Sequence, residues 1–373
     1  MSESIYLDWN ATTPPLPAVV EAMAAACREA WGNPSSVHAP GRKARAVIED
    51  AREAVARLAG CEARDVFFTS GGTEANNIAL RSGFIESSGV LVTSRLEHPS
   101  VTRVAEALER EGRARVRWVA VRSDGTLDVE DLERALAGGG VRLVAVQAVN
   151  SETGVIQAVA GVLCAARRAG ARVHVDAVQA YGRLEDVAQG ADTRSLAGHK
   201  IRGPKSMGAL VSRPGVALAP LLLGGSQERG VRAGTIDPIA AAGLAAAARH
   251  AIDSPARWAA LAPLRDRLEA GLLRLSPGGR VNGATAPRAP HVTNVAFPGW
   301  RGPELVAALD LEGVAVSAGS ACSAGTAEPS AVLVAMGDLE GAKSSVRFSL
   351  GEETRGADVD AALVAAERVL ARR

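Results

Sequence analysis

Residues 141–179, VRLVAVQAVNSETGVIQAVAGVLCAARRAGARVHVDAVQ, contain the pattern that decides the fold. Residues 141–149 and 173–176 are β-branched runs that predict strands, and residues 159–169 between them predict a helix. This order is typical of parallel strands joined by a helix that covers the sheet. We therefore expect an α/β fold built on a mostly parallel sheet.

The same alternation extends over residues 66–211. Further strands are expected at 66–69, 90–93, 116–121 and 209–212, with helices at 101–110 and 129–136. In folds of this kind, ligands gather at the carboxyl ends of the strands. The polar residues that directly follow a strand are therefore the first candidates for a functional site.

After Gly243 the pattern changes. An Ala-rich helical stretch covers residues 239–252 and continues beyond Pro255 to Leu275. Extended segments are expected at 291–297, 314–317 and 345–349, with helices at 303–309 and 357–372. We expect a large α/β domain over residues 15–250 and a smaller α+β domain made of residues 1–14 and 251–373.

Composition and charge exclude several classes of protein. The chain has 373 residues with 42 basic and 41 acidic side chains, so its net charge is +1 and gives no sign of a nucleic-acid partner. The longest apolar run, residues 239–248, is about half the ~20 residues that span a bilayer. The first residues, MSESIYLDWN, do not resemble a signal peptide. We expect a cytoplasmic protein without a membrane partner.

The four cysteines form no CxxC pair, so neither a structural zinc site nor a disulfide framework is expected. Cys27, Cys61 and Cys164 lie in helix or helix-end contexts, where we expect small buried side chains. Cys322 differs, because it lies in SAGSACSAG (residues 317–325), a run of small residues that cannot form a core element. No metal site is expected.

A glycine-rich turn opens the predicted helix after residue 69. In SGGTEANN (residues 70–77), Gly71 and Gly72 let the backbone turn tightly, and the helix N-terminus offers N–H groups and a positive dipole end to a phosphate. Glycine-rich turns are common, so this motif alone is weak. No GxGxxG follows a predicted strand, which disfavours a nicotinamide site.

Other strand ends carry His98, Asn150, Asp176 with Gln179, and the pair His199 and Lys200. Each has an ordinary structural explanation when it is taken alone. Together they supply an aromatic ring, a carboxylate and an amine beside the phosphate turn, the groups that pyridoxal 5′-phosphate requires. Only four lysines are present, and Lys205 in the GPK turn is the rival of Lys200, whereas Lys43 and Lys343 lie away from strand ends.

Ten ordered motifs carry a resemblance that covers essentially the whole chain. The sequence resembles the class V aminotransferase-like proteins of PLP-dependent transferase fold type I, and among them the cysteine desulfurases of the IscS/NifS type. The motifs are YLDWNATTP, GNPSSVHAPGRKAR, TSGGTEANN, LEHPSV, VNSETGVIQ, HVDAVQ, GHKIRGPKSMGAL, GGSQERGVRAGT, SAGSACSAGTAEPS and SVRFSLG.

The resemblance implies a role for each matching residue. Lys200 would form the Schiff base, Asp176 would pair with the pyridinium nitrogen, and Gln179 would bond the phenolic oxygen. His98 would stack on the ring and take part in proton transfer. The implied phosphate site comprises Gly72, Thr73, His199 and Thr235, the last from the second subunit of a homodimer.

For the substrate, the resemblance implies L-cysteine held through its carboxylate by Asn150 and Arg347. Cys322 would become a persulfide, alanine would leave, and the sulfur would pass to a protein acceptor such as an iron–sulfur scaffold or another sulfur carrier. Iron–sulfur assembly, tRNA thiolation, DNA phosphorothioation and cofactor synthesis all remain open as destinations.

Two departures from the family pattern are visible. The family often has Ser as a phosphate ligand where this chain has Ala197, so that phosphate contact is either missing or supplied by another group, Ser195 being one candidate. The chain ends at VLARR, whereas housekeeping members carry a longer tail that contacts the scaffold protein. Two alternatives to a cysteine desulfurase remain: a selenocysteine lyase on the same scaffold, and a binding protein that keeps only the fold. The histidines at 38, 174, 250 and 291 are expected to be structural or on the surface.

Overall fold

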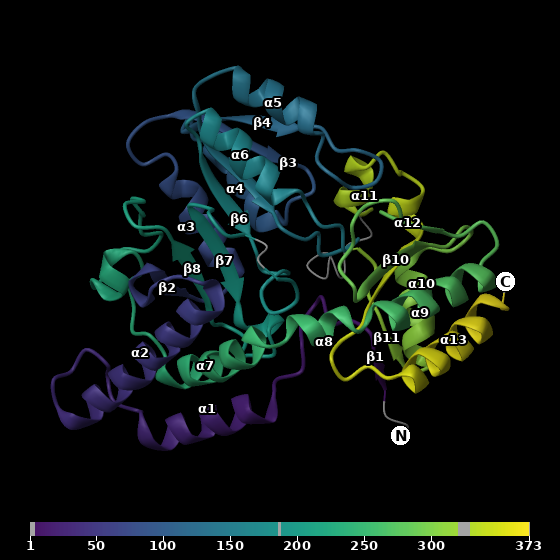
Figure 1. The fold of residues 1–373 in the computed structure, drawn as a ribbon. Coiled ribbons are helices and arrows are strands. Elements are labelled where there is room, and N and C mark those ends of the chain that lie inside the picture. Colours follow the sequence, from purple (N-terminus) through teal and green to yellow (C-terminus); the bar gives the residue numbers. More distant parts are fainter. Residues whose placement is uncertain (1–3, 186–187, 320–328, 373) are drawn as a thin grey trace.

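A computed structural model describes residues 4–185, 188–319 and 329–372 (Figure 1). Seven strands form the main sheet in the order β2-β8-β7-β6-β5-β3-β4. They are β2 (Val66–Thr69), β3 (Gly89–Ser94), β4 (Ala114–Val119), β5 (Val141–Gln147), β6 (Arg172–Asp176), β7 (Thr193–Ala197) and β8 (Gly208–Ser212). Within this sheet β8 runs opposite to the other six strands, so the mostly parallel sheet is confirmed.

Helices cover both faces of this sheet because its buried strands alternate apolar side chains between the faces. Leu91 and Leu143 pack with α3 (Gly72–Ser82) and α4 (Pro99–Arg110), whereas Val92 and Val144 pack with α5 (Val129–Ala137) and α6 (Val159–Arg168). At the β2 end, α1 (Pro17–Glu29), α2 (Ala39–Ala59) and α7 (Pro238–Ile252) share a third core cluster (Figure 1).

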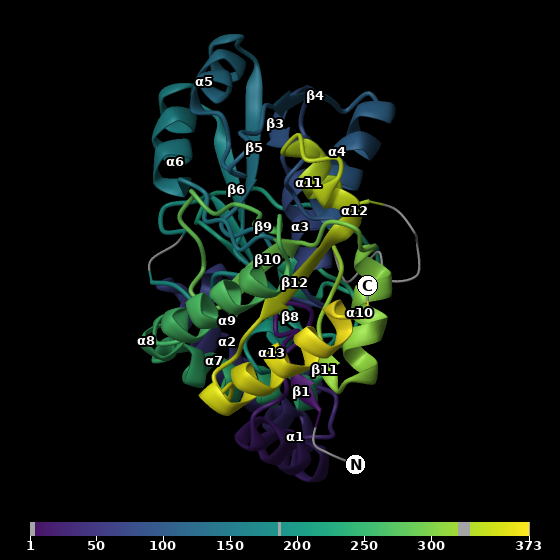
Figure 2. The same ribbon diagram turned by 90° about the vertical axis from the view of Figure 1, so that its right-hand side faces the viewer.

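A smaller sheet lies beside the main one in Figure 1 and in front of it in Figure 2. It has the antiparallel order β12-β10-β9, and the parallel pair β1-β11 lies next to it. The strands are β1 (Ile5–Tyr6), β9 (Arg280–Val281), β10 (Val292–Ala296), β11 (Val314–Ala315) and β12 (Ser345–Ser349). The helices are α8 (Pro255–Ala259), α9 (Ala262–Leu275), α10 (Gly302–Leu311), α11 (Ala331–Ala335), α12 (Gly341–Ser344) and α13 (Gly356–Leu370).

The N-terminal segment packs with the C-terminal part of the chain. Leu7 and Trp9 belong to the same core cluster as Leu268 of α9, Phe348 of β12 and Val359 of α13. This packing agrees with the proposed assignment of residues 1–14 to the smaller domain, which stays a prediction. Among the described residues, no helix is long and apolar enough to cross a membrane.

The structure corrects some expectations. The strand predicted at 116–121 is β4, which lies two residues earlier, and the helix predicted beyond Pro255 is divided into α8 and α9. Cys27 and Cys164 are exposed rather than buried, because they lie on the solvent faces of α1 and α6. Burial raises the pKa of Cys61 to about 11. His250 is half-buried, and its Nε2 lies 2.7 Å from Glu352.

Candidate active site

The Lys200 amine and the Gln179 amide meet at one carbonyl oxygen. Lys200 ends the turn that follows β7, and its Nζ donates to the carbonyl oxygens of Asn10 at 2.5 Å and Ala11 at 2.7 Å. Gln179 Nε2 donates to the same Asn10 oxygen at 3.1 Å. Both side chains therefore reach one point at the carboxyl edge of the parallel strands, as the strand-end argument predicts.

Asp176 ends β6 and is 7% exposed. Its Oδ1 accepts from Val178 N at 3.0 Å and Ser195 Oγ at 3.3 Å, and its Oδ2 accepts from Asn76 Nδ2 at 2.8 Å. These three donors are neutral, so hydrogen bonds compensate part of the cost of burying the carboxylate. The fully buried Ser195 hydroxyl is engaged here, which argues against Ser195 as the replacement phosphate ligand.

His98 is the N-cap of α4, where its Nδ1 accepts from Ser100 N at 3.1 Å and lies 2.8 Å from Ser100 Oγ. Ser100 Oγ also accepts from Asn76 Nδ2 at 2.8 Å. Because Asn76 also donates to Asp176, the structure joins His98 to Asp176 through two intervening side chains. The two groups lie 78 positions apart in the sequence.

Gly72 begins α3 beside Val178, which follows Asp176 by two residues. A Cβ atom at this position would lie 2.6 Å from Val178 Cγ2 and 3.8 Å from Ala197 Cβ, so a side chain cannot be added without a shift of Val178. Gly71 before it has φ 147°, a conformation that glycine adopts easily. Thr73 is exposed in the first turn of the helix. Ala197, the departure from the family pattern, therefore lies beside this helix start.

His199 precedes Lys200, and its Nδ1 lies 3.2 Å from Thr12 Oγ1. Burial and then the nearby Lys200 charge lower the pKa of His199 to about 4, so the ring is neutral at pH 7. Thr235 is exposed in the segment that leads to α7. The nearby Arg232 forms an ion pair with Glu74 of α3 at 3.3 Å, so this segment is attached to the same helix start.

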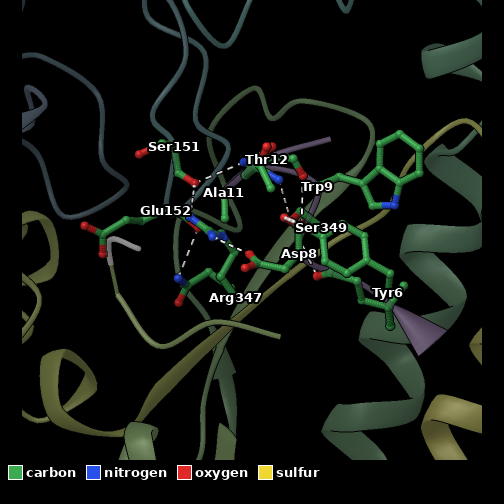
Figure 3. Close-up of polar contacts among 12 residues, drawn as sticks. Tyr6, Asp8, Trp9, Ala11, Thr12, Ser151, Glu152, Arg347 and Ser349 are labelled. Atoms are coloured by element: carbon green, nitrogen blue, oxygen red, sulfur yellow. Dashed lines mark hydrogen bonds and ion pairs between the residues drawn. The ribbon is translucent and has the colours of Figure 1, made fainter. Parts of the chain in front are cut away.

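Arg347 of β12 lies between Asp8 and Ser151 (Figure 3). Its Nη2 donates to Asp8 Oδ1 at 2.6 Å and its Nη1 to Ser151 O at 3.0 Å. The Nε atom is buried and has no hydrogen-bond partner among the described residues. Asn10 Nδ2 donates to the same Ser151 oxygen at 3.0 Å, so Asn10 connects Arg347 to Lys200.

The side chain of Asn150 is used by its own turn. Its Oδ1 accepts from the backbone N–H groups of Glu152 at 3.0 Å and Thr153 at 2.9 Å, and its Nδ2 donates to Leu96 O at 3.2 Å. Its predicted contact with the substrate stays a proposal. Cys322 lies outside the described residues, and so does the rest of residues 320–328.

Sequence reasoning missed Arg183, which is 1% exposed. Its Nη1 donates to Asn10 Oδ1 at 2.8 Å and to Gln179 Oε1, and its Nη2 donates to the carbonyls of Trp9 and Lys200, both at 3.2 Å. Burial, and then the charge of Arg347, lowers the pKa of Arg183 to about 9. Asn10 lies in the motif YLDWNATTP, but the sequence could not predict its role, because its hydrogen-bond partners come from distant segments.

Two buried carboxyls were also missed. Burial raises the pKa of Glu97 well above its usual range, and the Asp176 charge adds to the effect. Burial likewise raises the pKa of Glu152, which accepts from Ser330 Oγ at 2.6 Å. No group of three or more His, Cys, Asp or Glu residues within 4–185, 188–319 and 329–372 could hold a metal ion.

Comparison with known proteins identifies the class. The model of the aminotransferase class-V family matches residues 5–362, so the chain belongs to this family. Within the family, it is 41% identical to an IscS-like cysteine desulfurase of Mycobacterium tuberculosis, over 96% of this chain and 94% of that protein. It is 42% identical to a cysteine desulfurase of Cereibacter sphaeroides, over 96% and 93% of the two chains.

Solved structures of similar proteins point to the same family. A NifS-like protein superposes with a TM-score of 0.90 at 33% identity, covering 99% of this chain and 100% of the other. A structure of SspA in complex with cysteine has a TM-score of 0.81 at 30% identity, covering 93% and 99%. The expected fold and the IscS/NifS resemblance are confirmed.

Proposed function

We propose that this protein is a pyridoxal phosphate-dependent cysteine desulfurase that converts L-cysteine to L-alanine and leaves a persulfide on Cys322. Relatives of 41% and 42% identity over nearly the whole chain carry the desulfurase name. The observation that carries the proposal is the convergence of the Lys200 amine and the Gln179 amide on the Asn10 carbonyl. A lysine at this edge of the sheet can bind an aldehyde.

The donor set fits pyridoxal phosphate. Gly72 lets the start of α3 pack closely against Val178, where a Cβ atom would lie 2.6 Å from Val178 Cγ2, and the N-terminus of this helix suits a phosphate. Thr73 and His199 would complete the phosphate site, with Thr235 from the partner subunit of a homodimer. Asp176 would face the ring nitrogen and His98 the ring. When bound, the cofactor supplies an electron sink for the substrate Cα.

The chain's own groups then hold and move protons. Lys200 Nζ is the group proposed to take the proton from the substrate Cα, and the carbonyls of Asn10 and Ala11 accept its hydrogens. Arg183 donates to Gln179 Oε1, which turns the Gln179 amide so that Nε2 is the end available to an oxygen acceptor. The phenolic oxygen of the cofactor is such an acceptor.

Arg347 is the proposed partner of the substrate carboxylate, together with Asn150. Its Nε has no hydrogen-bond partner among the residues that the structure describes. This Nε and the remaining hydrogens of Nη1 and Nη2 can donate to a carboxylate while the contacts with Ser151 and Asp8 persist. A planar guanidinium can bind a carboxylate through two parallel hydrogen bonds. Asp8 holds the plane of that guanidinium in place.

Sulfur transfer requires a thiolate, because the thiolate is the nucleophilic form of cysteine. The Cys322 thiolate attacks the substrate sulfur, the new S–S bond forms, and the substrate C–S bond breaks. The electron pair of that bond stays with the carbon skeleton, which takes up a proton and leaves as alanine. A protein acceptor, an iron–sulfur scaffold or another sulfur carrier, would then receive the sulfur. The cytoplasmic location stays a prediction.

A spectrum and a product assay test this proposal. We expect the purified protein to be yellow with pyridoxal phosphate and to release alanine and sulfide in equal amounts from L-cysteine and a reductant. Cys322→Ala should keep the colour and lose sulfide, and Lys200→Ala should lose turnover. A yellow protein that is inert on cysteine, or a fully active Cys322→Ala variant, would overturn the substrate assignment. Activity on selenocysteine alone would favour the lyase alternative.

A further inference from the structure

Five buried polar side chains form one continuous hydrogen-bonded chain behind the proposed cofactor site. Asn76 of α3 is its centre, with Asp176 and Ser100 on one amide end and His174 on the other. His174 lies two residues before Asp176 on β6 and contacts Thr193 of β7. Asn76, His174 and Thr193 are 1%, 0% and 4% exposed, so water does not supply alternative partners.

The amide of Asn76 has a single orientation that satisfies its neighbours. Its Nδ2 donates one hydrogen to Asp176 Oδ2 and the other to Ser100 Oγ, each at 2.8 Å. The rotated amide would place Oδ1 against the Asp176 carboxylate, which offers only lone pairs. Oδ1 must therefore face His174 Nε2, which lies 2.9 Å away.

This orientation determines where the proton of His174 lies. Since Asn76 Oδ1 is an acceptor, His174 Nε2 carries the hydrogen, and Nδ1 is left to accept from Thr193 Oγ1 at 2.9 Å. Burial lowers the pKa of His174 to about 4, although the nearby Asp176 charge acts in the opposite direction. The ring therefore carries one proton at pH 7, in agreement with the hydrogen-bond geometry.

The same reasoning extends to His98. Ser100 Oγ accepts from Asn76, so its own hydrogen is available for His98 Nδ1 at 2.8 Å. The backbone N–H of Ser100 donates to the same nitrogen at 3.1 Å. With two donors directed at Nδ1, the neutral ring of His98 carries its hydrogen on Nε2.

We propose that Asn76, Ser100 and His174 are positioning residues that hold Asp176 in one orientation and fix His98 as its Nε2–H tautomer. Any proton that His98 gives to the cofactor or substrate then leaves from Nε2. The part of the proposal that concerns the cofactor rests on the proposed function, whereas the two tautomers do not. Asn76 couples Asp176 to His98, because the same Nδ2 group donates one hydrogen to Asp176 and the other to Ser100, which contacts His98.

The test compares two identical substitutions at adjacent positions. Asn76→Asp removes both donors and places a second carboxylate beside Asp176. Asn77→Asp is the matched control, because within the described part of the chain Asn77 Nδ2 donates only to the Thr73 carbonyl, at 2.9 Å, in an exposed hydrogen bond. Ser100→Ala removes the hydroxyl that donates to His98 and accepts from Asn76, but it leaves the bonds of Asn76 to Asp176 and His174 in place. This variant should therefore alter His98 and leave His174 unchanged.

Nitrogen-15 NMR of histidine-labelled holoenzyme reads the tautomers directly. The chain has six histidines, and His98→Gln and His174→Gln variants assign the two signals. In the wild type we expect protonated Nε2 and unprotonated Nδ1 at both residues. Asn76→Asp should produce a mixture of tautomers at His98 and weaken pyridoxal phosphate affinity at least tenfold, whereas Asn77→Asp should match the wild type in both measurements.

Two results would overturn the inference. One is a wild-type His98 with its proton on Nδ1, and the other is an Asn76→Asp protein with wild-type tautomers and cofactor affinity. If Asn76→Asp does not fold, Ser100→Ala decides the question through the His98 signal alone. A protein that takes up no pyridoxal phosphate contradicts the proposed function, but the tautomers can still be measured on that same sample.

Discussion

The two halves of the candidate site are built differently. In the cofactor half, the three described hydrogen-bond donors to the buried Asp176 carboxylate are neutral, and they come from α3, β7 and the turn after β6. In the substrate half, Arg347 meets the oppositely charged Asp8, which lies 339 positions away in the sequence. The order of strands in the parallel sheet brings the residues of the cofactor half together. The substrate half forms only when the two ends of the chain pack against each other.

The difference has an energetic consequence. A buried ion pair is costly to break, because the remaining charge stays desolvated without a partner. A carboxylate held by neutral donors depends instead on the correct orientation of each donor. We therefore expect the substrate half to respond to loss of charge, and the cofactor half to respond to changes in protonation and hydrogen-bond direction.

The largest effect is expected for Arg347→Met, which leaves Asp8 unpaired in the substrate half. The side chains of Arg347 and Asp8 are 2% and 18% exposed, so we expect a loss of about 3–5 kcal/mol in the free energy of unfolding. KM for L-cysteine should rise by about two orders of magnitude, corresponding to roughly 2–3 kcal/mol of lost carboxylate binding. Urea unfolding and steady-state kinetics measure the two effects.

The matched control breaks an exposed pair of the same chemistry. Arg81 and Glu111 form an ion pair with two hydrogen bonds, at 3.0 and 3.1 Å, and their side chains are 34% and 45% exposed. Arg81→Met should change the free energy of unfolding by no more than about 1 kcal/mol. Equal losses for Arg347→Met and Arg81→Met would contradict the importance of the buried pair.

The second prediction is a loss of stability in acid that originates in the cofactor half. His174 has a folded pKa of about 4, below its unfolded value of about 6.5, so the unfolded chain binds the proton first. Stability is therefore complete above pH 6.5 and decreases as the pH falls toward 4, by roughly 3 kcal/mol at most. Urea unfolding between pH 7 and 4 measures this slope.

Two histidine-to-glutamine variants test whether the pH dependence of stability originates at His174. His174→Gln cannot take up the proton and should flatten the pH dependence. His38→Gln changes an exposed N-cap histidine, which accepts from Gly41 N at 3.3 Å, and should leave the slope as in the wild type. The neutral His199, with its pKa also near 4, should account for part of what remains after His174→Gln. An unchanged slope in His174→Gln would refute this prediction.

A smaller effect is expected for Arg183→Met, which tests the boundary between the halves. The substitution removes the hydrogen bonds that Arg183 donates to the side chains of Asn10 and Gln179 and to two backbone carbonyls. It also removes a buried charge. We expect a net loss of about 2 kcal/mol in the free energy of unfolding. The visible band of the bound cofactor should also shift, because Gln179 loses its fixed orientation. A wild-type band would contradict the positioning of Gln179.

The smallest effect is expected for Lys205→Ala. Lys205 is exposed, whereas Lys200 donates to two backbone carbonyls inside the site. The variant should keep the yellow colour, the affinity for pyridoxal phosphate and the desulfurase rate within twofold of the wild type. Loss of the yellow colour in Lys205→Ala, with colour retained in Lys200→Ala, would reverse the assignment of the two lysines.

Much of the cofactor half could be predicted because its residues follow strands. The β-branched run of residues 173–176 placed Asp176 at a strand end, and Lys200 was expected to follow a short strand, which the structure shows as β7. Parallel strands bring such residues to the same edge. Asn76 was part of the TEANN motif, but its role could not be predicted from that motif. Its hydrogen-bond partners lie in distant segments, Ser100 on α4 and both Asp176 and His174 on β6. Local patterns contain no information about which buried amide meets which donor.

The amino-acid sequence by itself determined the α/β class, much of the helix and strand order over residues 66–211, the family and the amine, carboxylate and imidazole of the proposed chemistry. Those features depend on periodicity and on motifs that are continuous in the chain. The tertiary structure alone decided the Asp8–Arg347 pair, the place of Arg183 behind Gln179, and the hydrogen-bond direction through Asn76. These depend on contacts between distant segments, whose geometry exists only after the two sheets and their helices have packed.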